Sequence, residues 1–443
     1  MFRPLSRRSF LKTTSLGSAA LMCGVSRAAS ANSKLNVAAV GVGGKGKSDL
    51  TSVASSPYVN IVALCDIDES KDHLGWAAEE YPQAKRYFDW RKMLEQSDID
   101  AVIVATPDHM HAPISLAAMA LGKHVYCEKP LSHTVEEARA MTNAAAKMKV
   151  VTQMGNQIQS HEYYRTAVRL IQDGAIGKIR EVQSWQAGNS SWNRWTDRVP
   201  GSNPVPEGVH WDLWLGVAPE RPYVSECYHP YNWRNWQDFG TGKLGDFACH
   251  ILDPVFTALK LTSPKSLVGV NPKLNSEVWI NDNVVTYEFP GTEFTAGPTI
   301  KVTWTNGLGK IPSREALSLP AGVKIPTAGS VFIGEEGQLV LPHVGAPVLS
   351  PTDKFAEYKI PKVEGRNHYT DWADACRGEG VATSNFSYSG PLTETVLLGI
   401  VASRVPGETL QWDAAEMKIT NNEKANQFLR REYRTGWTPP LLS

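Results

Sequence analysis

The chain has no excess of either charge and is poor in cysteine. Lys and Arg together total 45 residues, as do Asp and Glu, so the formal net charge is zero. Domains that bind nucleic acid usually carry a basic excess, and we therefore expect no nucleic-acid partner. Only six cysteines occur among 443 residues, and none forms a CxxC pair. A disulfide framework is not supported, and buried free thiols are expected instead.

Metal-ligand clusters and long apolar runs are also missing. No group of His, Cys and Glu residues has the spacing of a metal site, so no metal is expected. The apolar stretch from Thr13 to Val25 is too short to span a bilayer, and no permanent membrane span is expected in the mature form. Tryptophan, by contrast, is abundant at 14 residues, many of them between Trp185 and Trp236. Flat aromatic rings suit sugar binding, although core packing would explain about half of them equally well.

The first thirty residues have the pattern of a targeting segment. Ser6-Arg7-Arg8-Ser9-Phe10-Leu11-Lys12 resembles a twin-arginine export signal, and Ala29-Ser30-Ala31 is a small-residue cleavage site. We therefore expect a signal peptide over residues 1–31 and a periplasmic location. Cys23 follows Leu21-Met22 and matches a lipoprotein acceptor site poorly, so lipid anchoring there is not expected.

Strand–helix alternation over residues 34–154 predicts a doubly wound parallel sheet. Its first strand, Leu35 to Val40, runs into Gly41-Val42-Gly43-Gly44-Lys45-Gly46, and Asp66 closes the second strand. In this fingerprint the glycines allow a tight turn, a close approach to a pyrophosphate and close packing of the helix, while the carboxylate binds a ribose. A Rossmann domain that binds NAD is therefore predicted, with NADP disfavoured because Asp66 would repel its 2′-phosphate. The predicted strands are 35–40, 60–65, 101–105, 123–127 and 150–153; the predicted helices lie near 46–56, 70–80, 90–96, 111–121 and 134–147.

The pattern of apolar and polar residues changes after Gly155, and this change predicts a second α/β domain over residues 155–443. Alternating strands favour one large, mostly antiparallel open sheet. The expected elements are a helix over 162–173, a loop region over 188–229, strands at 277–289, 300–304, 330–334 and 338–341, and helices over 368–377 and 392–403.

Two groups of polar residues are candidates for the catalytic site. Glu128-Lys129-Pro130 follows the short strand that ends at Cys127, at the edge of an α/β sheet where ligands bind. If residues 245–259 form one helix, Asp246 and His250 share a face and can share a proton with a substrate hydroxyl. The alternative is an acid stabilised by the helix dipole beside a core histidine.

Taken together, these motifs resemble the glucose–fructose oxidoreductase and inositol dehydrogenase family (Gfo/Idh/MocA), most closely its exported, twin-arginine members. The resemblance implies an NAD(P)-dependent oxidoreductase that moves a hydride to or from a secondary hydroxyl of a sugar, cyclitol or glycoside. It implies that Lys129 binds the reacting hydroxyl, that Lys129-Pro130 is a cis peptide, and that Asp246 and His250 complete the catalytic group. His250 is the implied proton acceptor, but the residues alone leave Lys129 and His250 open as the ultimate base.

The remaining site predictions fall into three groups. The cofactor-binding residues are predicted to be Gly41, Gly43, Gly44, Gly46, Asp66, Thr106, Pro107, His109, His111, Glu128, Lys129 and Asn156. The substrate-binding residues are predicted to be Lys129, Gln157, Tyr163, Arg165, Trp233, Arg234, Asp246 and His250. Packing or capping explains other pocket candidates at least as well: His229, Tyr231 and Arg366-Asn367-His368. His73 and His343 are interpreted as surface residues without a role.

Two competing functions stay open. A branch of the family cleaves glycosides by transient NAD-dependent oxidation and elimination; its best-known members carry a Tyr-Pro-Thr-His-Gly-type motif, whereas Gly240 to Asp246 here follows the dehydrogenase pattern. A non-catalytic sugar- or cofactor-binding protein is the third possibility, and the presence of both Lys129 and His250 argues against it. The resemblance also implies a homodimer or homotetramer built on the open sheet. The periplasm has no obvious NAD(H) pool, so tightly bound NAD is expected.

Overall fold

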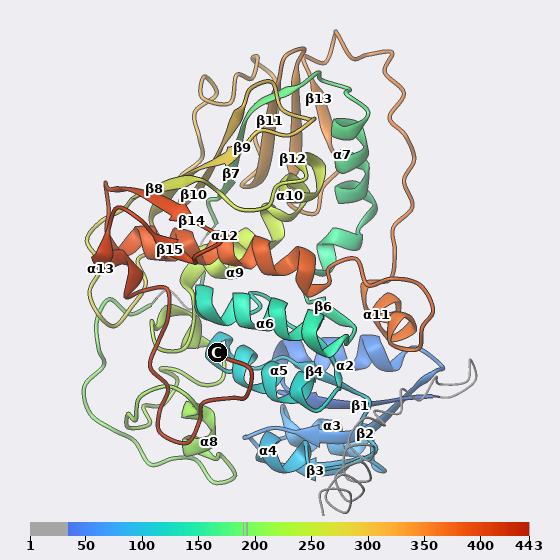
Figure 1. Ribbon diagram of the computed structural model, residues 1–443, viewed down its shortest axis with the longest axis vertical. Helices are drawn as coiled ribbons and strands as arrows, with labels where there is room; N and C mark the ends of the chain where they lie inside the picture. The colour runs from blue at the N-terminus through green and yellow to red at the C-terminus, as the bar shows by residue number, and fades with distance from the viewer. Residues whose placement is uncertain (1–33, 189, 192–193, 443) are drawn as a thin grey trace, which may run out of the picture. The chain divides into compact units, whose positions relative to one another are not determined.

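The computed structural model describes residues 34–188, 190–191 and 194–442 (Figure 1). The predicted signal peptide, residues 1–31, lies outside the described residues. The first sheet is parallel, with the strand order β3-β2-β1-β4-β5-β6. Its strands are β1 (Leu35–Val40), β2 (Val59–Cys65), β3 (Lys85–Tyr87), β4 (Ala101–Val104), β5 (His124–Cys127) and β6 (Thr152–Met154). Its helices are α2 (Gly44–Ala54), α3 (Leu74–Glu80), α4 (Trp90–Met93), α5 (His111–Ala120) and α6 (Val135–Met148).

The degree to which each strand is buried explains which strands could be predicted from the sequence. Every residue of β4 is buried, because helices cover both faces of a parallel sheet and its strands read as continuous apolar runs. The edge strand β3 has the sequence Lys-Arg-Tyr and is largely exposed, so it carries no apolar signal and was not predicted. Strand order reverses between β1 and β4, which is where ligands bind in open α/β sheets.

The second sheet has the strand order β13-β12-β11-β7-β10-β9-β8-β14-β15. Its strands are β7 (Ile179–Gln186), β8 (Ser266–Val270), β9 (Asn283–Pro290), β10 (Thr299–Asn306), β11 (Ala328–Gly334), β12 (Gln338–Pro342), β13 (Val348–Ser350), β14 (Thr409–Asp413) and β15 (Lys418–Ile419). Neighbouring strands pair antiparallel except β7 with β10. The predicted fold class, a Rossmann sheet followed by a mostly antiparallel sheet, is confirmed.

Seven helices follow β6 in the described part of the chain. They are α7 (Glu162–Gln172), α8 (Trp211–Leu215), α9 (Gly242–Ile251), α10 (Asp253–Leu259), α11 (His368–Cys376), α12 (Phe386–Arg404) and α13 (Glu423–Asn426). Short 3-10 turns lie at Asp108–Met110, between β4 and α5, and after β6 at Gln157–Ser160 and Asn232–Asn235. Helix α12 packs beside α6 of the first sheet (Figure 1). The single helix expected over 245–259 is wrong: the chain breaks at Leu252, and α10 restarts with Pro254 in its first turn, where the missing N–H costs nothing.

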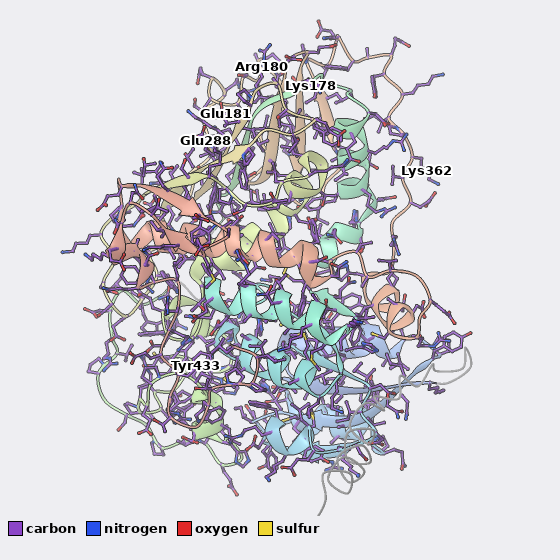
Figure 2. All side chains as sticks on the ribbon, viewed as in Figure 1. Lys178, Arg180, Glu181, Glu288, Lys362 and Tyr433 are labelled. Carbon is purple, nitrogen blue, oxygen red and sulfur yellow. The ribbon has the colours of Figure 1, made fainter. Side chains whose placement is uncertain are left out.

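One face of the second sheet is packed in the main core; the other is open along β9 and β10 and is covered over β7, β11 and β12 by Leu317, Leu319 and Val323. Residues alternate strictly between buried and half-exposed along β9. On the open face Lys301 lies opposite both Glu181 and Glu288, which Figure 2 shows on this sheet. Opposite charges on neighbouring strands stabilise a sheet modestly, so this face is polar and charged at its centre.

Two expectations about the whole chain can be compared with the described part. The five cysteines in it are all free thiols, and Cys65, Cys127, Cys227 and Cys249 are buried, which confirms the interpretation of buried free thiols. Within the same residues, no helix combines the length and the apolar character needed to cross a membrane.

Candidate active site and dinucleotide site

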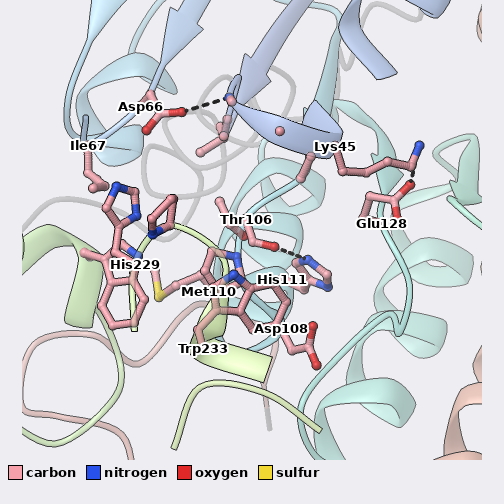
Figure 3. Close-up of a pocket in the computed structure, with 18 of the residues that line it drawn as sticks. Lys45, Asp66, Ile67, Thr106, Asp108, Met110, His111, Glu128, His229 and Trp233 are labelled. Atoms are coloured by element: carbon pink, nitrogen blue, oxygen red, sulfur yellow. Dashed lines mark hydrogen bonds and ion pairs between the residues drawn. The ribbon is translucent and has the colours of Figure 1, made fainter. Parts of the chain in front are cut away.

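A cavity of about 610 Å³ opens where β1, β2, β4 and β5 end. Its size lies within the range of small-molecule and cofactor pockets. The glycine loop and Asp66 line one part, and Lys129, Asp246 and His250 line another. Figure 3 shows this pocket with residues from both sheets' connecting segments around it.

The glycine loop has the geometry that a dinucleotide needs. Gly41 has φ of +77°, and a Cβ there would lie 2.7 Å from the Ala105 carbonyl oxygen. A Cβ on Gly46 would lie 1.9 Å from the Gly41 carbonyl oxygen, so this glycine lets α2 pack against the loop. The N-terminus of α2 has no side-chain cap, and its first residues, Gly43 to Lys45, line the cavity, where the unpaired N–H groups of a helix N-terminus favour an anion. An anion such as a pyrophosphate fits there.

Asp66 stands at the end of β2 and faces this loop (Figure 3). Its Oδ2 accepts hydrogen bonds from the backbone N–H groups of Val42 at 2.8 Å and Gly43 at 3.3 Å. The carboxylate is therefore held where ribose hydroxyls would reach it. This position fits the sequence-based assignment of Asp66 to the cofactor.

Lys129 and Asp246 form a largely buried ion pair. The Lys129 Nζ donates to Asp246 Oδ1 at 2.5 Å and to the Asp246 main-chain carbonyl at 2.8 Å. Arg234 Nε lies 3.3 Å from the same Oδ1. Burial alone would raise the pKa of Asp246, but the charges of Lys129 and Arg234 hold it below its ordinary value. The pair is thus an ammonium and a carboxylate, and one Nζ–H of Lys129 remains to donate into the pocket.

His250 lies one helical turn after Asp246 and lines the same cavity. Its Nδ1 is buried and has no hydrogen-bond partner among the residues that the structure describes. Burial, followed by the charge of Lys129, lowers the pKa of His250 well below its ordinary value. The ring is therefore neutral and can accept a proton.

His111 ties two pocket segments together. Its Nδ1 lies 2.7 Å from the Pro130 carbonyl oxygen, and its Nε2 lies 2.7 Å from the Thr106 carbonyl oxygen (Figure 3). Carbonyls only accept, so both contacts require N–H groups and hence an imidazolium. Burial would lower the pKa of His111, but Cys127, Asp108 and the Pro130 carbonyl outweigh it and raise the value to about 10. The Lys129-Pro130 bond is cis, as the family resemblance implied.

Several predicted site residues lie elsewhere. His109 turns away from the cavity: its Nε2 is 3.1 Å from the Trp214 carbonyl oxygen. Asn156 is buried and donates to Asp253 at 2.8 Å, so its amide serves the fold behind the pocket. The cavity lining also excludes Gly46, Gln157, Tyr163 and Arg165, and Arg165 donates to the Glu364 carbonyl at 2.8 Å. It likewise excludes Arg366, which pairs with Asp371, Asn367, which caps α11, and His368, whose ring makes a hydrogen bond with Ser160.

The tryptophan-rich segment divides between core and pocket. Trp185 and Trp236 are fully buried in hydrophobic clusters. Trp214 and Trp233 line the cavity, as does Tyr231. The Arg234 guanidinium lies 4.2 Å from the Trp233 ring centre, which orients it beside Asp246.

The interpretation of His73 as a surface residue is wrong. Its Nδ1 lies 3.5 Å from Asp66 Oδ2, and its ring packs on Gly43. His229 comes from the far side of the pocket, and its Nε2 lies 2.7 Å from Asp68 Oδ2. The three side chains Asp68, His73 and His229 offer ligand atoms within 4.8 Å of one another, a combination that could hold a cation. At 2.7 Å the His229–Asp68 contact is a hydrogen bond, which fastens residues 229–234 across the end of β2.

The interpretation of His343 as a surface residue does not fit the structure either. It is half-buried beside His250, with ring centres 5.9 Å apart. No sequence signal joins positions 73, 229, 250 and 343, because only the packing of distant segments brings the first three to one cavity and His343 beside His250.

The fold and the site define a two-domain protein with a dinucleotide-binding Rossmann sheet and an adjoining Lys–Asp–His group. A family model described as "Oxidoreductase family, NAD-binding Rossmann fold" matches residues 35–156, and one described as "Oxidoreductase family, C-terminal alpha/beta domain" matches residues 164–292. Together the matches cover more than half of the chain, which therefore belongs to the Gfo/Idh/MocA oxidoreductase family.

Two curated relatives illustrate the range of that family. The chain is 27% identical over 235 residues to levoglucosan dehydrogenase of Pseudarthrobacter phenanthrenivorans, which covers 49% of this chain and 50% of that protein. It is 31% identical over 206 residues to a glycosyl hydrolase family 109 protein of Saccharopolyspora erythraea, which covers 40% of this chain and 44% of that protein. The chain thus spans half or less of the length of these relatives.

Solved structures share the fold over a longer range. The WlbA dehydrogenase of Chromobacterium violaceum, in complex with NADH and UDP-GlcNAcA, has a TM-score of 0.60 at 18% identity and covers 86% of this chain and 96% of its own. Levoglucosan dehydrogenase in complex with NADH has a TM-score of 0.56 at 21% identity and covers 85% of this chain and 99% of its own.

Proposed function

We propose that this protein is an NAD-dependent oxidoreductase that transfers a hydride between the cofactor and a secondary hydroxyl or ketone of a sugar, cyclitol or glycoside. One observation carries the proposal: Lys129, Asp246 and His250 meet in the cavity that the glycine loop also lines. A charge-assisted donor and a neutral acceptor beside a dinucleotide groove are the groups that alcohol oxidation needs.

The residues present fit a nicotinamide dinucleotide. Gly41 and Gly43 line the cavity without side chains of their own, Asp66 faces the ribose position, and Thr106 Oγ1 is buried without a partner in the described part of the chain. NAD bound there would supply the hydride acceptor. Asp66 favours NAD over NADP, because its carboxylate would repel a 2′-phosphate.

The protein's own residues handle the hydroxyl and its proton. The remaining Nζ–H of Lys129 donates to the substrate oxygen, and Asp246 fixes the position of that ammonium. An ammonium in an ion pair has no lone pair, whereas the neutral imidazole of His250 does. His250 is therefore the base in this proposal.

The pocket walls support a polar, ring-shaped substrate. Trp233 and Tyr231 provide flat faces, and Arg234 provides donors next to the Lys129–Asp246 pair. A match to inositol 2-dehydrogenase of Klebsiella pneumoniae, 34% identical over 149 residues, supports a cyclitol or sugar substrate.

Glycoside cleavage by transient oxidation is the second candidate. The similarity to a glycosyl hydrolase family 109 protein, at 31% identity, favours it. Product analysis separates the two reactions: the dehydrogenase yields a keto-sugar with stoichiometric NADH, whereas the cleaving enzyme releases an aglycone without net NADH. We expect the keto-sugar.

We further propose that the protein is exported by the twin-arginine route and keeps its NAD bound, as a homodimer or homotetramer. The Ser6–Lys12 motif supports export, and the His229–Asp68 bond, which fastens one segment across the groove, supports retention. The open face of the second sheet, with Lys301 between Glu181 and Glu288, is the proposed oligomer surface.

The test is to isolate the protein from the periplasmic fraction, denature it and measure released nucleotide per chain. Retained NAD near one per chain supports the proposal, and a sugar screen with the intact protein then identifies the substrate. A protein that is recovered empty, binds added NAD weakly and oxidises no sugar would contradict it.

A further inference from the structure

The backbone of Arg234 is fixed in the cavity wall by its neighbours in the chain and in space. Arg234 lies in the 3-10 turn Asn232–Asn235. Asn235, which ends this turn, is buried, and its Nδ2 donates to the Trp195 carbonyl at 2.9 Å. A Cβ on Gly240 would lie 2.6 Å from the Arg234 Cα, so this glycine lets the two segments pack closely. The turn therefore presents the Arg234 side chain to the cavity from a held position.

Most hydrogen-bond donors of the Arg234 guanidinium are free. Of the five N–H groups of an arginine, the one on Nε donates to Asp246 Oδ1 at 3.3 Å and one on Nη1 donates to the Tyr231 carbonyl at 3.2 Å. Nη2 makes no hydrogen bond to the residues that the structure describes. Charge-assisted N–H to carboxylate bonds are about 2.7–2.9 Å long, so the contact with Asp246 is a weak one. N–H groups on both Nη atoms thus remain for a ligand.

Arg234 also has no carboxylate of its own at the substrate end of the cavity. The other charged side chains that line this end form three opposite pairs: Lys45 with Glu128, His111 with Asp108, and Lys129 with Asp246. Asp246 balances Lys129, because the Lys129 Nζ lies nearer to it than the Arg234 Nε does. Among the described residues of this lining, Arg234 is therefore the surplus cation.

The remaining acids near the cavity do not cancel this charge. Burial raises the pKa of Asp108 in the lining and that of Asp49 just behind it, so neither adds a full negative charge beyond the pairs above. Asp66 and Asp72 belong to the glycine-loop end. Because the Arg234 side chain is only 19% exposed, its charge attracts an anion more strongly than it would in open water.

Two aromatic rings favour a planar anion at this position. The guanidinium centre lies 4.2 Å from the Trp233 ring centre and 4.7 Å from that of Tyr231. Such contacts orient the guanidinium plane, and its donor edge matches the two oxygens of a carboxylate. One surplus positive charge balances one carboxylate, whereas a phosphate ester carries about 1.5 to 2 negative charges at pH 7.

We propose that Arg234 selects an anionic substrate: the sugar oxidised here is a sugar acid, whose carboxylate binds the Nη1 and Nη2 donors of Arg234. This inference rests on the proposed function and names the substrate class for the same site. Lys129 and Arg234 both contact Asp246 Oδ1, so the carboxylate lies close to the reacting hydroxyl. A hexuronic acid has this arrangement, because its carboxylate stands on the ring carbon next to a ring hydroxyl.

The first experiment compares substrates that differ only at C6. With NAD, kcat/KM is measured for methyl glucuronide against methyl glucoside and for methyl galacturonide against methyl galactoside. In one pair at least, we expect the acid to be favoured about tenfold or more, mainly through a lower KM. Raising sodium chloride from about 0.05 M to about 0.5 M should raise the KM of the acid and leave that of the neutral sugar unchanged. Glucose 6-phosphate should be a poorer substrate than the acid.

The variants test whether Arg234 is the source of this preference. In Arg234→Gln the ratio of kcat/KM between acid and neutral sugar should fall to about one, while Arg234→Lys should keep part of it, because the charge remains and the fork is lost. The matched control is Arg91→Gln. Arg91 also lies 4.2 Å from a tryptophan ring, that of Trp437, and pairs with Asp89, but it is outside the cavity lining. This control should keep the wild-type ratio.

A binding measurement separates this inference from the proposed function. Calorimetry on the protein saturated with NADH should show the preferred acid bound at least about tenfold more tightly than its neutral partner, and Arg234→Gln should remove the difference. A wild type that binds the acid but oxidises no sugar would contradict the proposed function and support the acid site. Equal kcat/KM within both pairs, or a preference that Arg234→Gln retains, would overturn the acid site. If Arg234→Gln does not fold, the wild-type ratios and Arg234→Lys decide the question.

Discussion

Replacing Lys129 by Met removes the ammonium while keeping most of the side-chain volume. The variant loses the donor to the substrate oxygen, and a hydrogen bond from a charged group contributes about 1.5–3 kcal/mol. That range corresponds to roughly tenfold to more than hundredfold in rate, because about 1.4 kcal/mol is a factor of ten. Lys129 also fixes Asp246 through two contacts, so we expect kcat to fall by on the order of a hundredfold or more.

The same change has a cost in stability that can be worked from the site. Removing one partner of a buried ion pair typically costs about 3–5 kcal/mol. Asp246 keeps Arg234 at 3.3 Å, so we expect a smaller loss of about 1–2 kcal/mol, which still permits folding. The charge that lowers the pKa of His250 also disappears, so the acid limb of the pH–rate profile should move to higher pH.

The assay compares kcat, NAD affinity and thermal unfolding for the wild type, Lys129→Met and the matched control Lys123→Met. Lys123 is also buried and donates to the Ile99 carbonyl at 2.9 Å, but it lies outside the cavity. The control should lose stability and keep its kcat. The reasoning would be refuted by a Lys129→Met variant with kcat within about threefold of the wild type.

Three further predictions follow from the groove. The wild type should bind NAD at least about tenfold more tightly than NADP, since Asp66 would face the 2′-phosphate; similar affinities by calorimetry would argue against that role. His111 should remain an imidazolium in the folded protein until pH approaches about 10, whereas its unfolded pKa is about 6.5. Its raised pKa means that its contribution to stability is complete below about pH 6.5 and is lost as pH rises toward about 10; an NMR titration near pH 6.5 would contradict this. His229→Ala, which breaks the bond to Asp68, should speed NAD release by about tenfold in stopped-flow measurements; an unchanged rate would show that this segment does not retain the cofactor.

Much of the first sheet and of its glycine-loop fingerprint could be predicted, because the signals for them lie in short stretches of sequence. The turn at Gly41, the acid at Asp66 and the segment at Lys129 each depend on residues adjacent in sequence, and the structure places all three in one cavity. The break before Asp253 was readable from Pro254, because proline begins a helix more easily than it continues one.

Other features depend on contacts between distant segments. β3, β13 and β15 are strands of two or three residues, too short for a periodic pattern. The position of His73 at the cavity and that of His343 beside His250 depend on how loops from different elements meet, and a histidine in a loop carries no local sign of its neighbours. For the same reason, the sequence placed Arg165 in a substrate pocket that α7 does not reach.

The central claim is that this cavity moves a hydride between a sugar hydroxyl carbon and NAD. The most direct measurement incubates the purified protein with NAD and a panel of sugars and cyclitols, each carrying deuterium on its ring carbons, and analyses the reduced cofactor by mass spectrometry. The account predicts that one class of sugar transfers deuterium to the nicotinamide and is recovered as a keto-sugar, and that Lys129→Met abolishes the transfer. Reduced cofactor without substrate-derived deuterium, or no reduction by any sugar in a protein that binds NAD, would contradict it.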